Sequence, residues 1–267
     1  MIPPVVVGID GSPESSAAVR WAAAQARPRG GGLVVFRAEL FDDPDLLPHR
    51  KPPVEAELLL EPGYRLLRRA ADEARRAMPG VSVRMCLRLG AAAGLLVEQS
   101  AEAGLLVLGS SGVGGVRGAV TGSVPLSVAA SARCPVAVVR GRADPAGPVV
   151  VGVDGSVGSE RALAFAFETA ETHGAALEAV HAWHDDSHRE SGVPEQVAAW
   201  SRKHPAVPVR VRAVRARSAA RALAGISRDA RVVVVGSRGR GPVAGGLLGS
   251  TGNGLLAHAA CPVVVAR

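Results

Sequence analysis

The chain has 267 residues, of which 48% are hydrophobic and 21% charged, a composition typical of a globular protein with two domains of ordinary size. Its apolar runs are shorter than the roughly 20 residues needed to cross a bilayer, no basic leader precedes the first strand-like segment, and its three cysteines do not form a disulfide framework. These features exclude membrane-spanning and disulfide-stapled secreted proteins, and we expect a cytoplasmic protein without a membrane partner.

The net charge of +7 raises the question of nucleic-acid binding. Only two of the 31 basic residues are lysines, and the arginines are interleaved with acids, as in Arg68, Asp72 and Arg75. Such interleaving is more typical of a solvated helix face than of a nucleic-acid stripe. We therefore do not expect nucleic acid as a partner.

Strand-like and helix-like segments alternate along the first half. The expected order is a strand ending at Asp10, a helix over 12–27, a strand over 33–38, a helix over 55–78, a strand over 81–87, a helix over 92–101, a strand over 105–108, a helix after Ser123 and a strand over 135–140. Strict alternation predicts an α/β fold with a parallel, doubly wound, Rossmann-like sheet and helices on both faces.

The same order occurs twice. Asp10-Gly11-Ser12 returns 144 positions later as Asp154-Gly155-Ser156, whereas later segments return after 127 positions. The second half is therefore 17 residues shorter, and the difference falls between its second and third strands. We expect two tandem domains, residues 1–142 and 147–267, joined by a linker too short to let them separate far.

A glycine-rich stretch follows the fourth strand of each half. Both copies have two glycines three positions apart, then nine residues, then Gly-Ser: Gly109, Gly112, Gly122 and Ser123, and Gly236, Gly239, Gly249 and Ser250. Glycines allow backbone N–H groups to approach an anion, and the following helix N-terminus favours negative charge. We expect a polyphosphate site in which Ser123 and Ser250 occupy the N-cap positions or instead bind a phosphate oxygen. A flexible loop without a ligand is the alternative.

Charge distribution around these stretches agrees with a phosphate ligand. No acid occurs between Glu102 and Asp144 or after Asp229, and Arg238 lies within the second copy. Asp10 and Asp154 would meet the loops if strands one and four are neighbours, because ligands bind beyond the carboxyl ends of such strands. There they could accept hydrogen bonds from ribose hydroxyls or an adenine amino group, or serve only as turn residues.

Other site signatures are absent or weak. The sequence has no Walker A lysine, no nucleophile elbow and no His-Glu-x-x-His. His181, His184, Asp185, Asp186 and His188 could suggest a metal cluster, but only one acid recurs in the first half, where Arg37 matches His181. A surface loop after the second strand explains them more simply, and we expect no metal site.

The Asp-Gly-Ser after strand one, the Gly-x2-Gly-x9-Gly-Ser pattern and the Cys-Pro-Val before the last strand together resemble the ATP-binding branch of the universal stress protein family. The resemblance covers nearly the whole chain twice. It implies five-stranded sheets in the order 3-2-1-4-5, ATP bound between strands one and four, and halves that pair through their fifth strands. Carried over by position, the ATP sites are Ile9, Asp10, Ser12, Gly109, Gly112, Gly122 and Ser123, and Val153, Asp154, Ser156, Gly236, Arg238, Gly239, Gly249 and Ser250.

The halves depart from the family pattern differently. Ser111 stands where the family often has arginine, which the second half keeps as Arg238, and the second half lacks 17 residues. We expect an ATP-binding stress-response switch or sensor that is no enzyme beyond slow ATP hydrolysis, and Mg²⁺ could accompany the ATP. A nucleotide-dependent enzyme and a scaffold for another adenine nucleotide, such as a cyclic one, are the alternatives. An unidentified regulatory protein and a homodimer are the expected partners.

Overall fold

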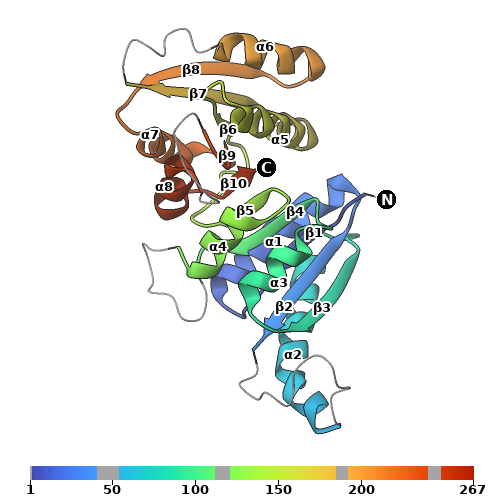
Figure 1. Ribbon diagram of the computed structural model, residues 1–267. Helices are drawn as coiled ribbons and strands as arrows, with labels where there is room; N and C mark the ends of the chain where they lie inside the picture. The colour runs from blue at the N-terminus through green and yellow to red at the C-terminus, as the bar shows by residue number, and fades with distance from the viewer. Residues whose placement is uncertain (1, 41–53, 112–120, 185–191, 240–247) are drawn as a thin grey trace.

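A computed structural model describes residues 2–40, 54–111, 121–184, 192–239 and 248–267 (Figure 1). Strands and helices alternate through both halves, as predicted. The first half contains β1 (Val5–Gly8), α1 (Pro13–Arg29), β2 (Leu33–Glu39), α2 (Val54–Ala77), β3 (Val83–Leu89), α3 (Ala92–Gln99), β4 (Leu105–Gly109), α4 (Ser123–Ser131) and β5 (Val136–Val139). The second contains β6 (Val149–Gly152), α5 (Val157–His173), β7 (Leu177–Trp183), α6 (Val193–Lys203), β8 (Val209–Arg215), α7 (Ala219–Ile226), a 3-10 turn (Ser227–Asp229), β9 (Val232–Gly236), α8 (Ser250–His258) and β10 (Val263–Ala266).

All ten strands belong to one sheet, in the order β3-β2-β1-β4-β5-β10-β9-β6-β7-β8. Each half has the predicted parallel order 3-2-1-4-5, so the fold class is confirmed. The two five-stranded sheets are continuous because β5 pairs antiparallel with β10, with Val138 opposite Val263 and Val136 opposite Val265. This is the junction that the family resemblance implies.

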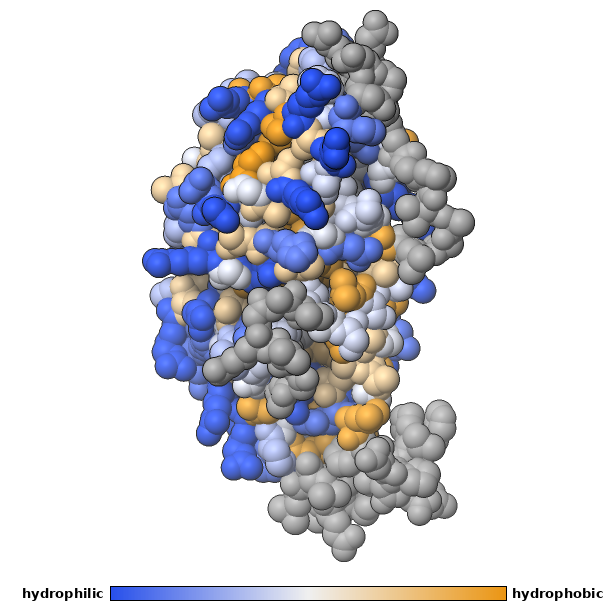
Figure 2. Space-filling model, turned by 90° about the vertical axis from the view of Figure 1, so that its left-hand side faces the viewer, coloured by the Kyte–Doolittle hydropathy of each residue, from blue (hydrophilic) through white to orange (hydrophobic). Residues whose placement is uncertain are grey.

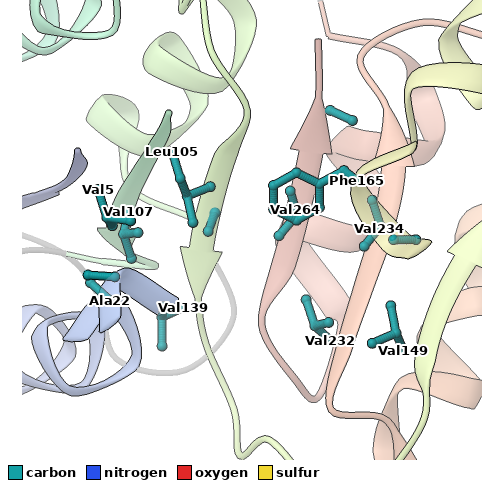
Figure 3. Close-up of a cluster of buried hydrophobic side chains, with 14 of the residues drawn as sticks. Val5, Ala22, Leu105, Val107, Val139, Val149, Phe165, Val232, Val234 and Val264 are labelled. Atoms are coloured by element: carbon teal, nitrogen blue, oxygen red, sulfur yellow. The ribbon is translucent and has the colours of Figure 1, made fainter. Parts of the chain in front are cut away.

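Alternating valines build a core on each face of the sheet. Val5 and Val7 pack with α1 and α2 on one face, whereas Val6 points to the face covered by α3 and α4. On the first face the core passes from one half into the other, through Val139 and Val264 at the junction (Figure 3). The halves therefore share buried apolar surface as well as strand hydrogen bonds, and this stabilises their relative position.

Polar contacts across the junction have approximate two-fold symmetry. Arg140 donates to the carbonyl of Leu256 in α8, and its repeat equivalent Arg267 donates to the carbonyl of Ala129 in α4. A second reciprocal pair joins α1 and α5, where Arg29 donates to Thr169 at 3.3 Å and His173 lies 3.1 Å from Gln25. Burial lowers the pKa of both Arg140 and Arg267.

The halves differ in the helix between their second and third strands. Helix α2 has 24 residues, whereas α6 has only 11. This is the region in which the repeat offset places the missing residues. Both helices lie on the same face of the sheet, so the helical cover of the second half is smaller on that face (Figure 1).

Charged groups are distributed over the surface. Figure 2 shows one face on which hydrophilic side chains alternate with small apolar patches. Several arginines pair with nearby acids, including Arg75 with Asp72 at 3.0 Å and Arg88 with Glu98 at 3.0 Å. Among the described residues, no helix is both long and apolar enough to cross a membrane.

Candidate functional site

The turns after β1 and β6 are tightly defined. Gly11 and Gly155 have φ values of 90° and 79°, a conformation that side chains disfavour. Oδ1 of Asp10 accepts from the N–H of Ser12 at 2.9 Å, and Oδ1 of Asp154 accepts from that of Ser156 at 3.0 Å. Each aspartate thus has a turn role, which uses one carboxylate oxygen.

Ser12 and Ser156 begin the helices that follow these turns. Their hydroxyls accept from the N–H groups of Ser15 at 3.1 Å and Ser159 at 3.2 Å, so they are the N-caps of α1 and α5. Neither serine is among the residues that line the cavities described below. Their predicted contact with a ligand rests on the family resemblance alone.

The sheet order brings each aspartate next to the glycine stretch of its own half. Strand β1 pairs with β4, and β6 pairs with β9. In the second half the approach is close, because a Cβ atom on Gly239 would lie 2.5 Å from Oδ2 of Asp154. The carboxylate of Asp154 therefore lies beside the glycine stretch, as expected.

Helices α4 and α8 begin one residue earlier than expected. Gly122 and Gly249 are the N-caps, and neither helix has a side-chain cap. The prediction that Ser123 and Ser250 occupy the N-cap is wrong, because the extended backbone of each glycine (φ −60° and −59°) already starts the helix and places the serine in the first turn. The first turn of each helix consequently has N–H groups that the N-cap residue does not satisfy with a side chain.

The glycines of each stretch have two different roles. Gly109 and Gly236 are required for packing, since a Cβ atom there would lie 2.8 Å from the backbone of Glu14 and 2.5 Å from that of Gly158. Gly122 and Gly249 are not, because their nearest contacts would be at 3.5 Å and their φ values are negative. Among the described residues there is no steric reason for glycine at 122 and 249, because a Cβ atom there would make only ordinary van der Waals contacts.

A cavity lies at this position in each half. The first has a volume of about 680 Å³, and its lining includes Ile9, Asp10, Gly109, Gly122 and Ser123. The second has a volume of about 260 Å³, and its lining includes Val153, Asp154, Gly236, Arg238, Gly239, Gly249 and Ser250. The predicted residues are thus brought together, except that Ser12 and Ser156 lie outside the linings and Gly112 lies outside the described residues.

The cavities differ at the residue that follows β4 or β9 by two positions. Arg238 lines the second cavity, while the equivalent position in the first cavity is Ser111. Burial and, after it, the charge of Arg238 lower the pKa of Arg267. An anionic group would relieve the repulsion between these two charges.

Several lining residues were not predicted as site residues, and two of them occupy equivalent positions in the repeat. Arg37 lines the first cavity and pairs through Nε with Oε1 of Glu39 at 2.6 Å, and His181 lines the second. The surface-loop interpretation is wrong for His181, because this residue lies in β7 and is only 9% exposed. The repeat alignment was the available signal, since it places both residues at the same point of the second strand.

The described residues contain no group of three or more side chains suited to holding a metal ion. Of the earlier candidate cluster, His181 and His184 line the second cavity. Asp185, Asp186 and His188 lie outside the described residues.

Comparisons with known proteins agree with this architecture. The model of the Universal stress protein family matches residues 1–140 and 146–267. The chain is 38% identical over 285 residues to universal stress protein Rv2005c of Mycobacterium tuberculosis, covering 98% of this chain and 96% of the relative. It is 36% identical over 289 residues to Rv2623 of the same organism, with the same coverage.

The solved structures include a protein with the same arrangement over its full length. A universal stress protein from Archaeoglobus fulgidus aligns with a TM-score of 0.76, covering 100% of this chain and 97% of that one. Its sequence identity is 19%, so this likeness concerns the fold.

Proposed function

Because the chain belongs to the universal stress protein family, we propose that it is an ATP-binding stress-response protein that acts as a nucleotide-dependent switch or sensor. The observation that carries this proposal is the pair of repeat-equivalent cavities at the starts of α4 and α8. In each, a glycine that packing does not require leaves space beside a helix N-terminus. That combination suits a phosphate group.

The residues have distinct roles in the proposed complex. The N–H groups at the start of α4 or α8 would bind phosphate, with the hydroxyl of Ser123 or Ser250 beside them. Asp10 or Asp154, whose carboxylate lines the cavity of its half, would accept from the ribose. Mg²⁺ bound to the phosphates would offset part of their negative charge.

We propose no rapid turnover of the nucleotide. The ionisable side chains in the described lining of the first cavity are Asp10 and Arg37, and Arg37 is paired with Glu39. A fast hydrolase needs a group that orients or activates water near the transferred phosphate. Slow hydrolysis of ATP is compatible with this lining.

Nucleotide analysis of the purified full-length chain tests the proposal. We expect ATP to be released on denaturation or, if none is retained, two ATP molecules to bind per chain in a calorimetric titration. Release of a cyclic adenine nucleotide would instead support the scaffold alternative, and turnover faster than about once per minute would support an enzyme. Failure to bind any adenine nucleotide would contradict the proposal.

We further propose that the switch acts in the cytoplasm through a regulatory protein that distinguishes the nucleotide-bound chain. A homodimer is a second candidate assembly. Co-purification with and without ATP, followed by sedimentation of the complex, would separate these two partners. A partner that binds equally in both conditions would contradict a nucleotide-dependent role.

A further inference from the structure

The two cavities differ in hydrogen-bonding polarity at one equivalent position. Arg37 on β2 lines the first, and His181 on β7 lines the second. A guanidinium group only donates hydrogen bonds, whereas an imidazole can also accept them. At this position the first cavity can therefore bind a hydrogen-bond acceptor of a ligand, whereas the second can bind a hydrogen-bond donor.

The tautomer of neutral His181 is fixed by a backbone contact. Its Nδ1 lies 2.9 Å from the carbonyl oxygen of Val153. A carbonyl oxygen only accepts, so Nδ1 carries the proton and Nε2 of the neutral ring is an acceptor. The ring is held between β6 and β7 in an orientation set by the main chain.

The Nε2 atom of His181 is buried and has no hydrogen-bond partner among the described residues. A buried acceptor without a donor is costly, and native proteins rarely leave one unexplained. His181 lines the second cavity, whereas its Nε2 atom has almost no accessible surface, so a ligand there could supply the missing donor only after the ring or its neighbours shift.

The sheet order indicates which part of a nucleotide would supply this donor. Strand β6 lies between β7, which carries His181, and β9, which leads to the start of α8. His181 is thus two strand spacings, about 10 Å, from the strand beside the phosphate end. With phosphate at α8 and ribose near Asp154, the base would reach β7.

We propose that His181 determines base specificity in the second cavity by accepting a hydrogen bond from the exocyclic amino group of adenine. This inference rests on the proposed nucleotide binding and adds the atom that selects the base. At the equivalent position of the first cavity, the guanidinium group of Arg37 presents only donors, so this side chain cannot accept from an amino group.

The test compares ATP with purine riboside 5′-triphosphate, which lacks only the 6-amino group. Calorimetric titration would use the full-length chain carrying Gly122→Asp, which is designed to leave only the second cavity available. We expect ATP to bind about three- to tenfold more tightly, the range for one hydrogen bond. The reciprocal Gly249→Asp chain should show no such preference in the first cavity.

Two substitutions separate the role of Nε2 from packing. His181→Leu removes the acceptor and should reduce the preference to about onefold. His181→Gln can still donate to Val153 and accept from the ligand, so it should retain part of the preference. In histidine-labelled protein, the nitrogen resonance of Nε2 should shift with ATP and not with the analogue.

The outcomes distinguish this inference from the proposal beneath it. Equal binding of ATP and the analogue by the second cavity, or a preference that survives His181→Leu, would overturn the role of His181 and leave nucleotide binding standing. Binding of neither triphosphate by the second cavity would overturn both.

Discussion

The first and second cavities are formed by the same backbone and lined by different side chains. Arg37, Ser111 and Pro125 in the first correspond to His181, Arg238 and Gly252 in the second, and the volumes are about 680 and 260 Å³. The turn aspartates, N-cap serines and strand order are the same in both halves. The residues that form the turns and helix starts are thus the same in the two halves, whereas these three positions of the cavity linings differ.

The starts of α4 and α8 illustrate this divergence. Pro125 is the third residue of α4 and has no N–H group, whereas Gly252 supplies one at the same position of α8. With Arg238 nearby, the second cavity offers more donors to phosphate in less space. We therefore expect the two sites to differ in both affinity and specificity.

Replacing the unhindered glycines should have the largest effect. Gly122→Asp should abolish ATP binding in the first cavity alone, and Gly249→Asp in the second alone, because a carboxylate would occupy the space beside phosphate. Calorimetry should show one ATP per chain in each variant. Gly122→Ala is the matched control, since its Cβ fits at 3.5 Å without adding charge and should weaken binding without abolishing it. Two ATP molecules bound by both aspartate variants would refute the placement of the sites.

Substituting the turn aspartates should have the next largest effect. Asp10→Ala and Asp154→Ala each remove a charged acceptor worth about 1.5–3 kcal/mol, which corresponds to roughly a ten- to hundredfold loss of affinity in the affected cavity. The glycine stretch should still hold the triphosphate, so preference for ATP over GTP should fall with affinity.

Asn substitutions distinguish the turn from the ligand contact. Asp10→Asn and Asp154→Asn keep an acceptor for the N–H of Ser12 or Ser156 but lose the charge. Reduced ATP affinity in stably folded Asn variants would indicate a ligand contact. Affinity equal to that of the parent chain would show that the aspartates act only in the turn.

Placing at positions 111 and 238 the residue found in the other half should change ATP affinity by a smaller factor. Arg238→Ser should weaken ATP binding in the second cavity about two- to fivefold, because Arg238 is exposed and its charge is screened. Ser111→Arg should strengthen binding in the first cavity to a similar extent. Both differences should shrink as salt is added, and differences that persist in high salt would exclude an electrostatic cause.

The α1–α5 contact should give the smallest effect, on stability. Burial, followed by the nearby cations Arg231 and Arg29, lowers the pKa of His173 below its ordinary 6.5. The unfolded chain therefore binds the proton more readily, so stability should decline as the pH falls below 6.5 and level off beneath the folded-state pKa. Urea unfolding of His173→Gln should show less of this decline, whereas exposed His258→Gln should behave like the parent chain. An unchanged profile in His173→Gln would rule out this contact as the source.

Much of the fold could be predicted because its determinants are local or repeated. Valine runs identify the buried strands, and Ser12 with Pro13 identifies the start of α1. The glycine spacing identified the segments after β4 and β9 that line the cavities. These segments lie beside the turns after β1 and β6 because parallel strands end at the same edge of the sheet. Spacing could not show that Gly109 is a packing residue, since that depends on the approach of α1 to β4.

His181 shows what sequence reasoning could not reach. The histidines and acids that follow it, from His184 to His188, favoured a surface loop. Its burial results from the pairing of β7 with strands on both sides and from the contact with Val153, which is 28 positions away. The N-cap error has a similar origin, because a serine one residue after a glycine can lie either before or inside the first turn.

The continuous sheet leaves β3 and β8 as its two open edges. Both edges carry exposed arginines: Arg84 and Arg88 on β3, and Arg210, Arg212 and Arg215 on β8. Two copies that approached edge to edge would bring guanidinium groups together, a repulsion that protects open strands from pairing with another chain. Pairing of the fifth strands inside one chain thus covers the uncharged edges and leaves only arginine-bearing edges open to another chain.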